Sequence, residues 1–165
     1  MRLPAGTLEL IAATPATLRA LLGALPDESI EQRDAGGWSV RDVVAHMLAV
    51  EEPAFRDRIT LILEQTNPTI PVVDEDATLE ASGYRLLPLS WLLDEFERRR
   101  AGDVAWFRSL DDLDRVGQHP AVGEVTVGNV LSHLAHHDAA HLQQIAGILD
   151  ATANTGRGNL RRLDA

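Results

Sequence analysis

Four of the six histidines in this chain fall within nine consecutive residues, inside the stretch LSHLAHHDAAHLQQI at positions 131–145. They are His133, His136, His137 and His141. Imidazole is a common ligand of divalent transition metals. Two imidazoles one helical turn apart can bind a single ion through metal–nitrogen bonds of about 2.0–2.1 Å. The stretch therefore indicates a metal site, on condition that it is helical and that two of these side chains face the same way.

A helix turns by about 100° per residue, so the sequence fixes the direction of each histidine relative to the apolar side chains. The apolar stripe of this segment is formed by Val130, Leu134, Ile145 and Ile148. His137 and His141 fall within that stripe, whereas His133 lies on its flank. His136 points most of the way to the opposite side and is expected to be solvated. His133 and His141 are two turns apart, about 12 Å along the axis, so a third ligand is either His133 paired with His137 alone or a residue from another helix.

His46, in VVAHMLAVEE at 43–52, is the candidate from another helix. It lies at the edge of the apolar stripe of its segment, from which it can reach sideways toward a neighbouring helix. The alternative for each of these histidines is an ordinary core residue held by hydrogen bonds, because a buried imidazole needs a polar partner in any case. His119, in QHPAVG, is expected to be a loop residue.

Four long helical segments must position these side chains. The apolar periodicity and the residues that start and stop helices place them at 7–25, 39–64, 89–110 and 126–149. Ser39, with Asp42 three residues later, approximates a capping box, and Thr126 is the expected N-cap of the last segment. Pro15 and Pro53 predict a bend or break in the first segment and a kink in the second.

The segments predict an all-α fold, a four-helix bundle with one or two long crossover connections. The connection at 66–87 is rich in proline and acidic residues, and connections of this length are often functional. The stretch GQHPAVGEVT at 117–126 is expected to be a loop or short turn, and the run Arg98–Arg100 a solvated face. We expect a single domain at 1–151 and a loosely ordered tail at 152–165.

Charge and composition limit the classes of partner. The chain has 15 basic and 25 acidic residues, a net charge of −10 that repels nucleic acid. No window approaches the roughly 18 uninterrupted apolar residues of a membrane span, and MRLPAGTLEL lacks the apolar region of a secretory signal. Cysteine is absent, which excludes disulfides and a cysteine nucleophile. The expectation is a cytoplasmic protein that acts on a small molecule, without nucleic-acid or membrane partners.

Three stretches resemble the DinB-like (DinB/YfiT-like) family of metal-binding four-helix bundles. They are GGWSVRDVVAHMLAVEE at 36–52, WLLDEFERRRAG at 91–102 and HPAVGEVTVGNVLSHLAHHDAAHLQQI at 119–145. The resemblance covers nearly the whole chain and implies that His46, His137 and His141 bind a divalent ion. It also implies that Glu51 and Gln144 orient the ligands or a bound water, and that the protein forms a homodimer.

Three neutral imidazoles leave open positions on a zinc or nickel ion, and imidazole suits these metals better than magnesium or calcium. An open position can hold a thiol as the reactive thiolate, or a water whose pKa falls toward about 7. Members of the family include transferases that use low-molecular-weight thiols, so a thiol-dependent transferase is the favoured hypothesis. A metal-dependent hydrolase and a non-enzymatic bundle braced by the ion are the alternatives.

The two enzymatic hypotheses need different side chains near the ion. A transferase needs cationic groups to hold the acidic parts of the thiol, and the candidates are Arg41, Arg56, Arg58 and Arg85. A hydrolase needs a carboxylate base, for which Glu51 and Asp138 are the candidates. The sequence does not place any of these groups relative to the histidines.

Overall fold

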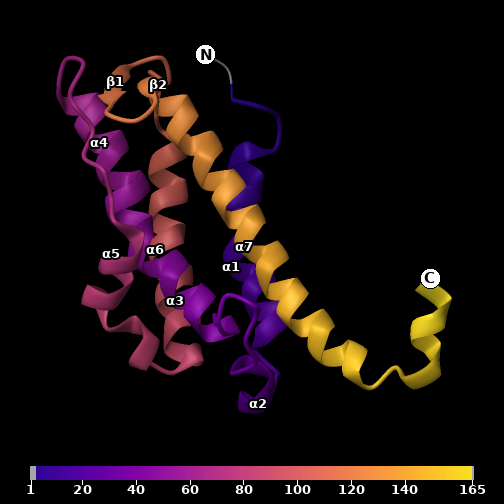
Figure 1. Ribbon diagram of the computed structural model, residues 1–165. Coiled ribbons are helices and arrows are strands. Elements are labelled where there is room, and N and C mark those ends of the chain that lie inside the picture. Colours follow the sequence, from indigo (N-terminus) through magenta and orange to yellow (C-terminus); the bar gives the residue numbers. More distant parts are fainter. Residues whose placement is uncertain (1–2, 165) are drawn as a thin grey trace.

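The computed structural model describes residues 3–164, and Figure 1 shows long helices that lie side by side with a small hairpin at one end. The elements in chain order are α1 (Thr7–Leu22), α2 (Asp27–Ile30), α3 (Val40–Glu51), η1 (Glu52–Arg56), α4 (Asp57–Glu64), α5 (Glu75–Ser82), η2 (Tyr84–Leu86), α6 (Leu89–Arg108), β1 (Val116–His119), β2 (Gly123–Thr126), α7 (Val127–Thr155) and η3 (Gly158–Asp164). The element η1 is a π-helix, while η2 and η3 are 3-10 helices.

Four rods make up the bundle: α1, the continuous run α3–η1–α4, α6 and α7. Helix α1 packs against α6 and α7, and α3 packs against the same two helices. Because α1 and α3 share both neighbours, they occupy opposite corners, and the connections 23–39 and 109–126 each cross the bundle diagonally. The predicted all-α four-helix bundle with crossover connections is confirmed.

Both predicted helix caps are present, and both start helices that carry the histidines. The Ser39 side chain accepts a hydrogen bond from the Asp42 backbone N–H at 3.1 Å, and the Asp42 carboxylate accepts one from the Ser39 N–H at 3.0 Å. Thr126 and Asn129 form the same reciprocal arrangement at the start of α7. Such boxes satisfy N–H groups that the helix itself leaves without partners.

The two prolines have different effects. Pro53 lies in η1, where the rod widens into a π-helix, which confirms an irregularity at this point. A proline removes one backbone donor and its ring collides with the preceding turn, and a π-bulge accommodates both. Pro15 lies inside α1, which runs without interruption from Thr7 to Leu22, so the break considered there does not occur.

Two segments differ from the sequence-based expectation. Residues 117–126 were expected to be a loop, but β1 and β2 pair as an antiparallel hairpin with Val116 opposite Thr126. Each strand has four residues and contains or borders glycine, so no alternating pattern marks it. The pairing is supported by tertiary contact, since the Ile70 N–H donates to the Gln118 carbonyl at 2.8 Å.

The C-terminal part of the chain is helical beyond the expected end of the last segment. Helix α7 continues past Leu149 and ends at Thr155, and Figure 1 shows η3 standing off the bundle. The domain boundary at residue 151 and the loose order of 152–165 stay predictions. Within residues 3–164, none of the helices has both the length and the apolar character needed to cross a membrane.

The apolar core is divided into two clusters, one toward each end of the bundle. On α6, Phe96 belongs to one cluster and Val104 to the other. Arg100 lies between them and is 1% exposed. The solvated face expected for this residue is therefore wrong, because a spacing of four residues from both Phe96 and Val104 puts Arg100 on the buried stripe of its helix.

Arg100 is paired with carboxylates from two other rods. Its Nε donates to Glu51 Oε1 at 2.6 Å, and its terminal nitrogens donate to both carboxylate oxygens of Asp138. Glu51 is 2% exposed and Asp138 is 0% exposed. A buried ionic layer thus connects α3, α6 and α7 at mid-bundle, the level at which α7 carries His137 and His141.

Candidate metal centre

Three imidazoles from two rods meet in the middle of the bundle. His46 lies on α3, and His137 and His141 lie one turn apart on α7. The Nε2 atom of His137 is 3.3 Å from Nε2 of His46 and 3.2 Å from Nε2 of His141. One ligand atom from each residue lies within 4.8 Å of the others, and no other such group of His, Asp or Glu residues occurs in the described part of the chain.

His46 reaches the site because α3 is enclosed on nearly all sides. Every residue of Val40–Glu51 except Arg41 is buried, and His46 is 4% exposed. The sequence places His46 at the edge of an apolar stripe, but α5, α6 and α7 all pack against α3, so the edge is also covered. Trp38 packs edge-on against His46 with ring centroids 5.4 Å apart.

A chain of hydrogen bonds fixes the tautomer of His141. A carboxylate only accepts, so the Gln144 amide turns its Nε2 toward Asp34 Oδ2 at 2.8 Å. Gln144 Oε1 then lies 2.9 Å from His141 Nδ1 and must accept a hydrogen from it. The hydrogen bond from Gln144, with that from the Trp38 backbone, lowers the pKa of Asp34 and keeps it ionised. His141 Nε2 is left with a lone pair directed at the other two imidazoles. The hydrogen bond between Gln144 and His141 is of the kind that the family resemblance implies for Gln144.

The site holds two of its imidazoles, those of His46 and His137, in the neutral form that binds metals. Burial, followed by the nearby His141, lowers the pKa of His46 to about 4. The same two causes lower the pKa of His137 to about 2. Both rings are therefore uncharged at pH 7, and their nitrogen lone pairs are free to coordinate.

The spacing of the nitrogens fits a divalent ion. A tetrahedral ion with bonds of about 2.0–2.1 Å holds its nitrogen ligands about 3.3–3.4 Å apart, close to the 3.2 and 3.3 Å found here. Hydrogen bonds among the rings alone do not satisfy the cluster, because one hydrogen on His137 Nε2 serves only one of its two neighbours. The donor set and its geometry are those expected of an open three-histidine site.

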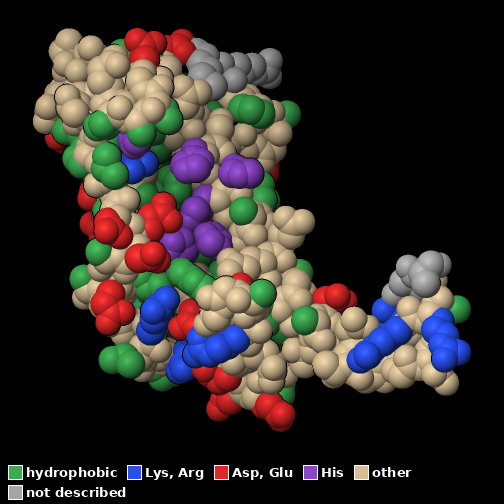
Figure 2. Space-filling view, viewed as in Figure 1, with side chains coloured by type: hydrophobic (Ala, Val, Ile, Leu, Met, Phe, Trp, Pro, Cys, Tyr) green, Lys and Arg blue, Asp and Glu red, His purple; other side chains and the backbone are tan. Residues whose placement is uncertain are grey.

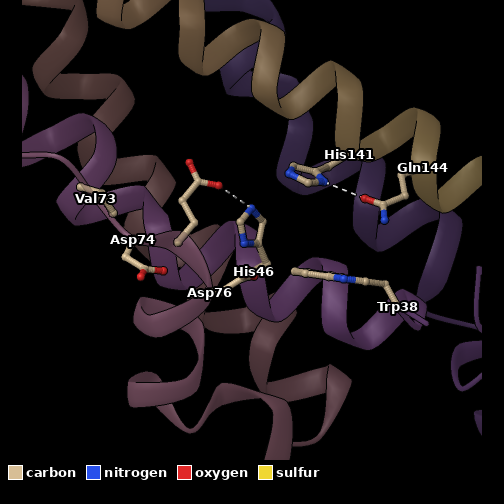
Figure 3. A pocket seen from close by; sticks show the side chains of 8 residues that line it. Trp38, His46, Val73, Asp74, Asp76, His141 and Gln144 are labelled. Atoms are coloured by element: carbon tan, nitrogen blue, oxygen red, sulfur yellow. Dashed lines mark hydrogen bonds and ion pairs between the residues drawn. The ribbon is translucent and has the colours of Figure 1, made fainter. Parts of the chain in front are cut away.

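Two of the three histidines, His46 and His141, line a pocket of about 510 Å³. Figure 3 shows His46 and His141 close together at this pocket, with Gln144 beside His141. The opposite wall is acidic and comes from the start of α5: Asp74, Glu75 and Asp76. Glu75 Oε2 lies 3.5 Å from His46 Nε2, and its side chain is 46% exposed. A carboxylate is therefore in place next to the imidazole cluster and in contact with solvent.

Sequence reasoning did not identify this acidic wall. The available signal was the length and acidity of the connection at 66–87, which indicates function but does not single out Glu75. The position of that residue depends on the packing of α5 against α3, which no periodicity within 66–87 reports.

The carboxylates that the sequence offers as catalytic bases lie elsewhere. Glu51 and Asp138 belong to the ionic layer around Arg100, and neither lines the pocket. Asp138 also accepts a hydrogen bond from the Thr14 hydroxyl at 2.8 Å. Neither candidate is therefore placed to act as the base, because both oxygens of Asp138 and one of Glu51 are engaged in the core. The hydrogen bond described for Glu51 joins it to Arg100 rather than to a histidine.

The remaining histidines lie outside the cluster. His136 is exposed, as predicted, and its ring stacks on that of His133 with centroids 6.4 Å apart. His119 lies at the end of β1, and its Nδ1 accepts a hydrogen bond from the Ala121 backbone N–H at 3.2 Å.

Metal-free protein is expected to lose stability as the pH falls from about 6.5 toward 4. Folding lowers the pKa of His46 from 6.5 to about 4, so in this window the unfolded chain binds a proton that the folded chain does not. The contribution of neutral His46 to the free energy of unfolding is therefore complete above pH 6.5 and is lost as the pH falls toward 4. Urea midpoints of chelator-treated protein at pH 7, 5.5 and 4.5 measure the effect. The decline should be smaller in His46→Gln, and equal declines in both proteins would contradict the prediction.

Comparisons with known proteins place the chain in a family. The profile described as the DinB superfamily matches residues 10–145. An Oceanobacillus iheyensis protein named "Putative metal-dependent hydrolase" is 30% identical over 135 residues, which cover 79% of this chain and 78% of that protein. A Bacillus cereus protein of the same name is 28% identical over 133 residues, covering 78% and 76% of the two chains.

A solved structure has the same fold. YfiT from Bacillus subtilis, described as "a probable metal-dependent hydrolase with an unusual four-helix bundle topology", matches with a TM-score of 0.80 and 24% sequence identity. The match covers 89% of this chain and 86% of YfiT. The family profile spans both rods that carry His46, His137 and His141. The chain belongs to the DinB superfamily.

Proposed function

We propose that this protein is a metal-dependent hydrolase whose divalent ion is bound by His46, His137 and His141. The observation that carries the proposal is the convergence of three imidazole Nε2 atoms beside a pocket, with separations of 3.2 and 3.3 Å for two of the pairs. Zinc or nickel is the proposed ion, because imidazole ligands suit these metals. The names of the relatives and the description of YfiT support hydrolysis as the reaction.

A divalent ion at this position supplies Lewis acidity and lowers the pKa of a bound water toward about 7. The side chains of the protein make separate contributions. Gln144 holds His141 with its Nε2 lone pair facing inward. Glu75, on the pocket wall and 3.5 Å from His46 Nε2, is positioned to take a proton from an attacking water and to return it to the leaving group.

Glu75 also favours hydrolysis over the thiol-dependent alternative. A thiolate needs no general base once it has lost its proton, and a carboxylate this close to His46 would repel it. The bracing alternative requires no opening, whereas His46 and His141 line a pocket of about 510 Å³. Hydrolysis is therefore the activity that the geometry supports best.

Replacing Glu75 with glutamine tests the proposed reaction. Loss of a general base lowers kcat by about 10²- to 10⁴-fold, while the three histidines remain to bind metal. The measurement is hydrolysis of a panel of nitrophenyl esters and anilides by zinc- or nickel-loaded protein, with metal content determined in parallel. Glu80→Gln on the exposed face of α5 is the matched control. Activity that survives chelation, or that is equal in the two variants, would count against the mechanism.

A further inference from the structure

A second cavity of about 320 Å³ lies along the same helix as the metal centre. It is enclosed by α4, α7 and the β-hairpin with the connection beside it. Its walls include the apolar side chains Ile70, Val125 and Val130. Figure 2 shows histidine side chains gathered on this face of the molecule, over α7. The cavity is therefore a largely apolar space next to the proposed catalytic site.

Arg58 brings a cationic group into this cavity. Its Nε atom is buried and has no hydrogen-bond partner among residues 3–164. Burial lowers the pKa of Arg58, which reports the cost of desolvating its charge. Arg56, two residues earlier, is by contrast paired with Asp103. Buried polar groups are normally hydrogen-bonded, and no ion pair of the half-buried Arg58 is found among residues 3–164, although the charge of Glu75 acts on it from farther away.

Two imidazoles line the cavity with Arg58. His119 Nδ1 accepts a hydrogen bond from the Ala121 N–H, so in the neutral ring Nε2 carries the hydrogen and is a donor. His133 is the second imidazole, and burial lowers its pKa, with His136 and Arg58 adding to the effect. A guanidinium and imidazole donors in an apolar space match a carboxylate attached to a hydrocarbon group.

The cavity and the metal centre are neighbours, and the buried ring of Phe55 lies between a histidine of each. The ring of Phe55 lies 5.7 Å from that of His133 and 5.2 Å from that of His137, measured between centroids. The negative charge of Glu75, whose carboxylate lies 3.5 Å from His46 Nε2, also acts to raise the pKa of Arg58 and of His133. His133 precedes His137 by one turn, a rise of about 6 Å. The cavity and the metal centre therefore lie about one helical turn apart along α7, a separation comparable to the length of a small molecule.

We propose that this second cavity binds the carboxylate end of the substrate, with Arg58 as its ion-pair partner and the apolar walls around the adjoining hydrocarbon. The bond to be hydrolysed then lies toward His46, His137 and His141. The part of the inference that concerns the substrate rests on the proposed function. It makes the substrate class a small carboxylic acid that carries a hydrolysable bond a few atoms from its carboxylate.

Hexanoate binding to zinc-loaded protein tests the inference without any reaction. Chemical shifts of isotope-labelled protein give the affinity, and hexanamide serves as the uncharged analogue of the same size. Wild-type protein should bind hexanoate and discriminate against hexanamide. Arg58→Gln should weaken hexanoate binding by about tenfold to 100-fold, since a hydrogen bond to a charged group is lost. Arg98→Gln, on the exposed face of α6, should leave the affinity unchanged.

A second variant covers the case in which Arg58→Gln does not fold. Val122 lines the cavity and is 70% exposed, so Val122→Asp places a negative charge at its mouth without disturbing the core and should also weaken hexanoate binding. Equal affinities for hexanoate and hexanamide, or wild-type affinity in both variants, would overturn the inference. Inorganic phosphate binding as tightly as hexanoate would overturn the choice of a carboxylate.

Repeating the titration on His141→Ala separates this inference from the proposed function. Hexanoate binding that persists without metal and depends on Arg58 supports the cavity, even if the wild-type protein proves to hold no metal and the hydrolase proposal fails. Binding that disappears with the metal but survives Arg58→Gln places the carboxylate on the ion. That result would overturn the cavity assignment and leave the metal centre intact.

Discussion

His141→Ala protein, purified without a histidine tag, should contain no stoichiometric divalent metal. His141 supplies one of three converging nitrogens, and its Nε2 lies 3.2 Å from that of His137. Two remaining imidazoles form a much weaker site, because each ligand of an open three-histidine centre carries a large share of the affinity. Elemental analysis of the wild type and the variant is the direct measurement.

The same variant should also lose metal-dependent stabilisation. An ion that binds only the folded state raises the free energy of unfolding by about 2.7 kcal/mol at 100 times its Kd. Added zinc or nickel should therefore raise the Tm of the wild type but not that of His141→Ala. His136→Ala is the matched control, because His136 lies on the exposed face of the same helix. Metal retained in His141→Ala, or lost in His136→Ala, would show that the ligand set is misassigned.

Arg100→Met should strongly destabilise the bundle core. Arg100 is 1% exposed and is the common partner of Glu51 and Asp138. Removing one partner of a buried ionic group strands the other charges, which costs about 3–5 kcal/mol. Burial already raises the pKa of Glu51 against the opposing effect of Arg100, so the loss of the guanidinium leaves that carboxylate without its main compensation. The urea midpoint of metal-free protein measures the change.

Two further proteins make this prediction specific. Arg98→Met alters an exposed arginine on the same helix and should change the free energy of unfolding by no more than about 0.5 kcal/mol. A triple variant with Arg100→Met, Glu51→Met and Asp138→Leu should recover most of the loss, because apolar replacements of a whole buried network are often neutral. Similar midpoints for Arg100→Met and Arg98→Met would refute a structural role for the ionic layer.

Much of the helical framework was predictable because its signals are local. Ser39 with Asp42 and Thr126 each mark a helix start by a capping pattern within four residues. Pro53 marks an irregularity in its helix, because proline has no backbone N–H to donate and its ring clashes with the preceding turn. The direction of each side chain around α7 also follows from the helical repeat, which paired His137 with His141 and turned His136 to solvent.

The errors arose where a residue's partner comes from elsewhere in the chain. Arg100 was grouped with Arg98 and Arg99 as a solvated run, although its spacing from Phe96 placed it on the buried stripe. The hairpin at 116–126 has no alternating pattern of its own, so its pairing was missed. Glu51 and Asp138 were candidates for the base of a hydrolase, because no local pattern in the sequence shows that Arg100 lies between them.

The sequence by itself determined the four long helical segments, the caps of two of them and the facing of His137 and His141, because these depend on residues a few positions apart along one backbone. Only the tertiary structure decided that His46 meets that pair, that Glu75 lies beside them and that Arg58 enters a neighbouring cavity. A helical repeat gives the angle of a side chain about its own axis but not the identity of the helix it faces. That choice was made by the packing of α3 and α5 against their neighbours, in which burial of apolar surface from distant segments selects one arrangement.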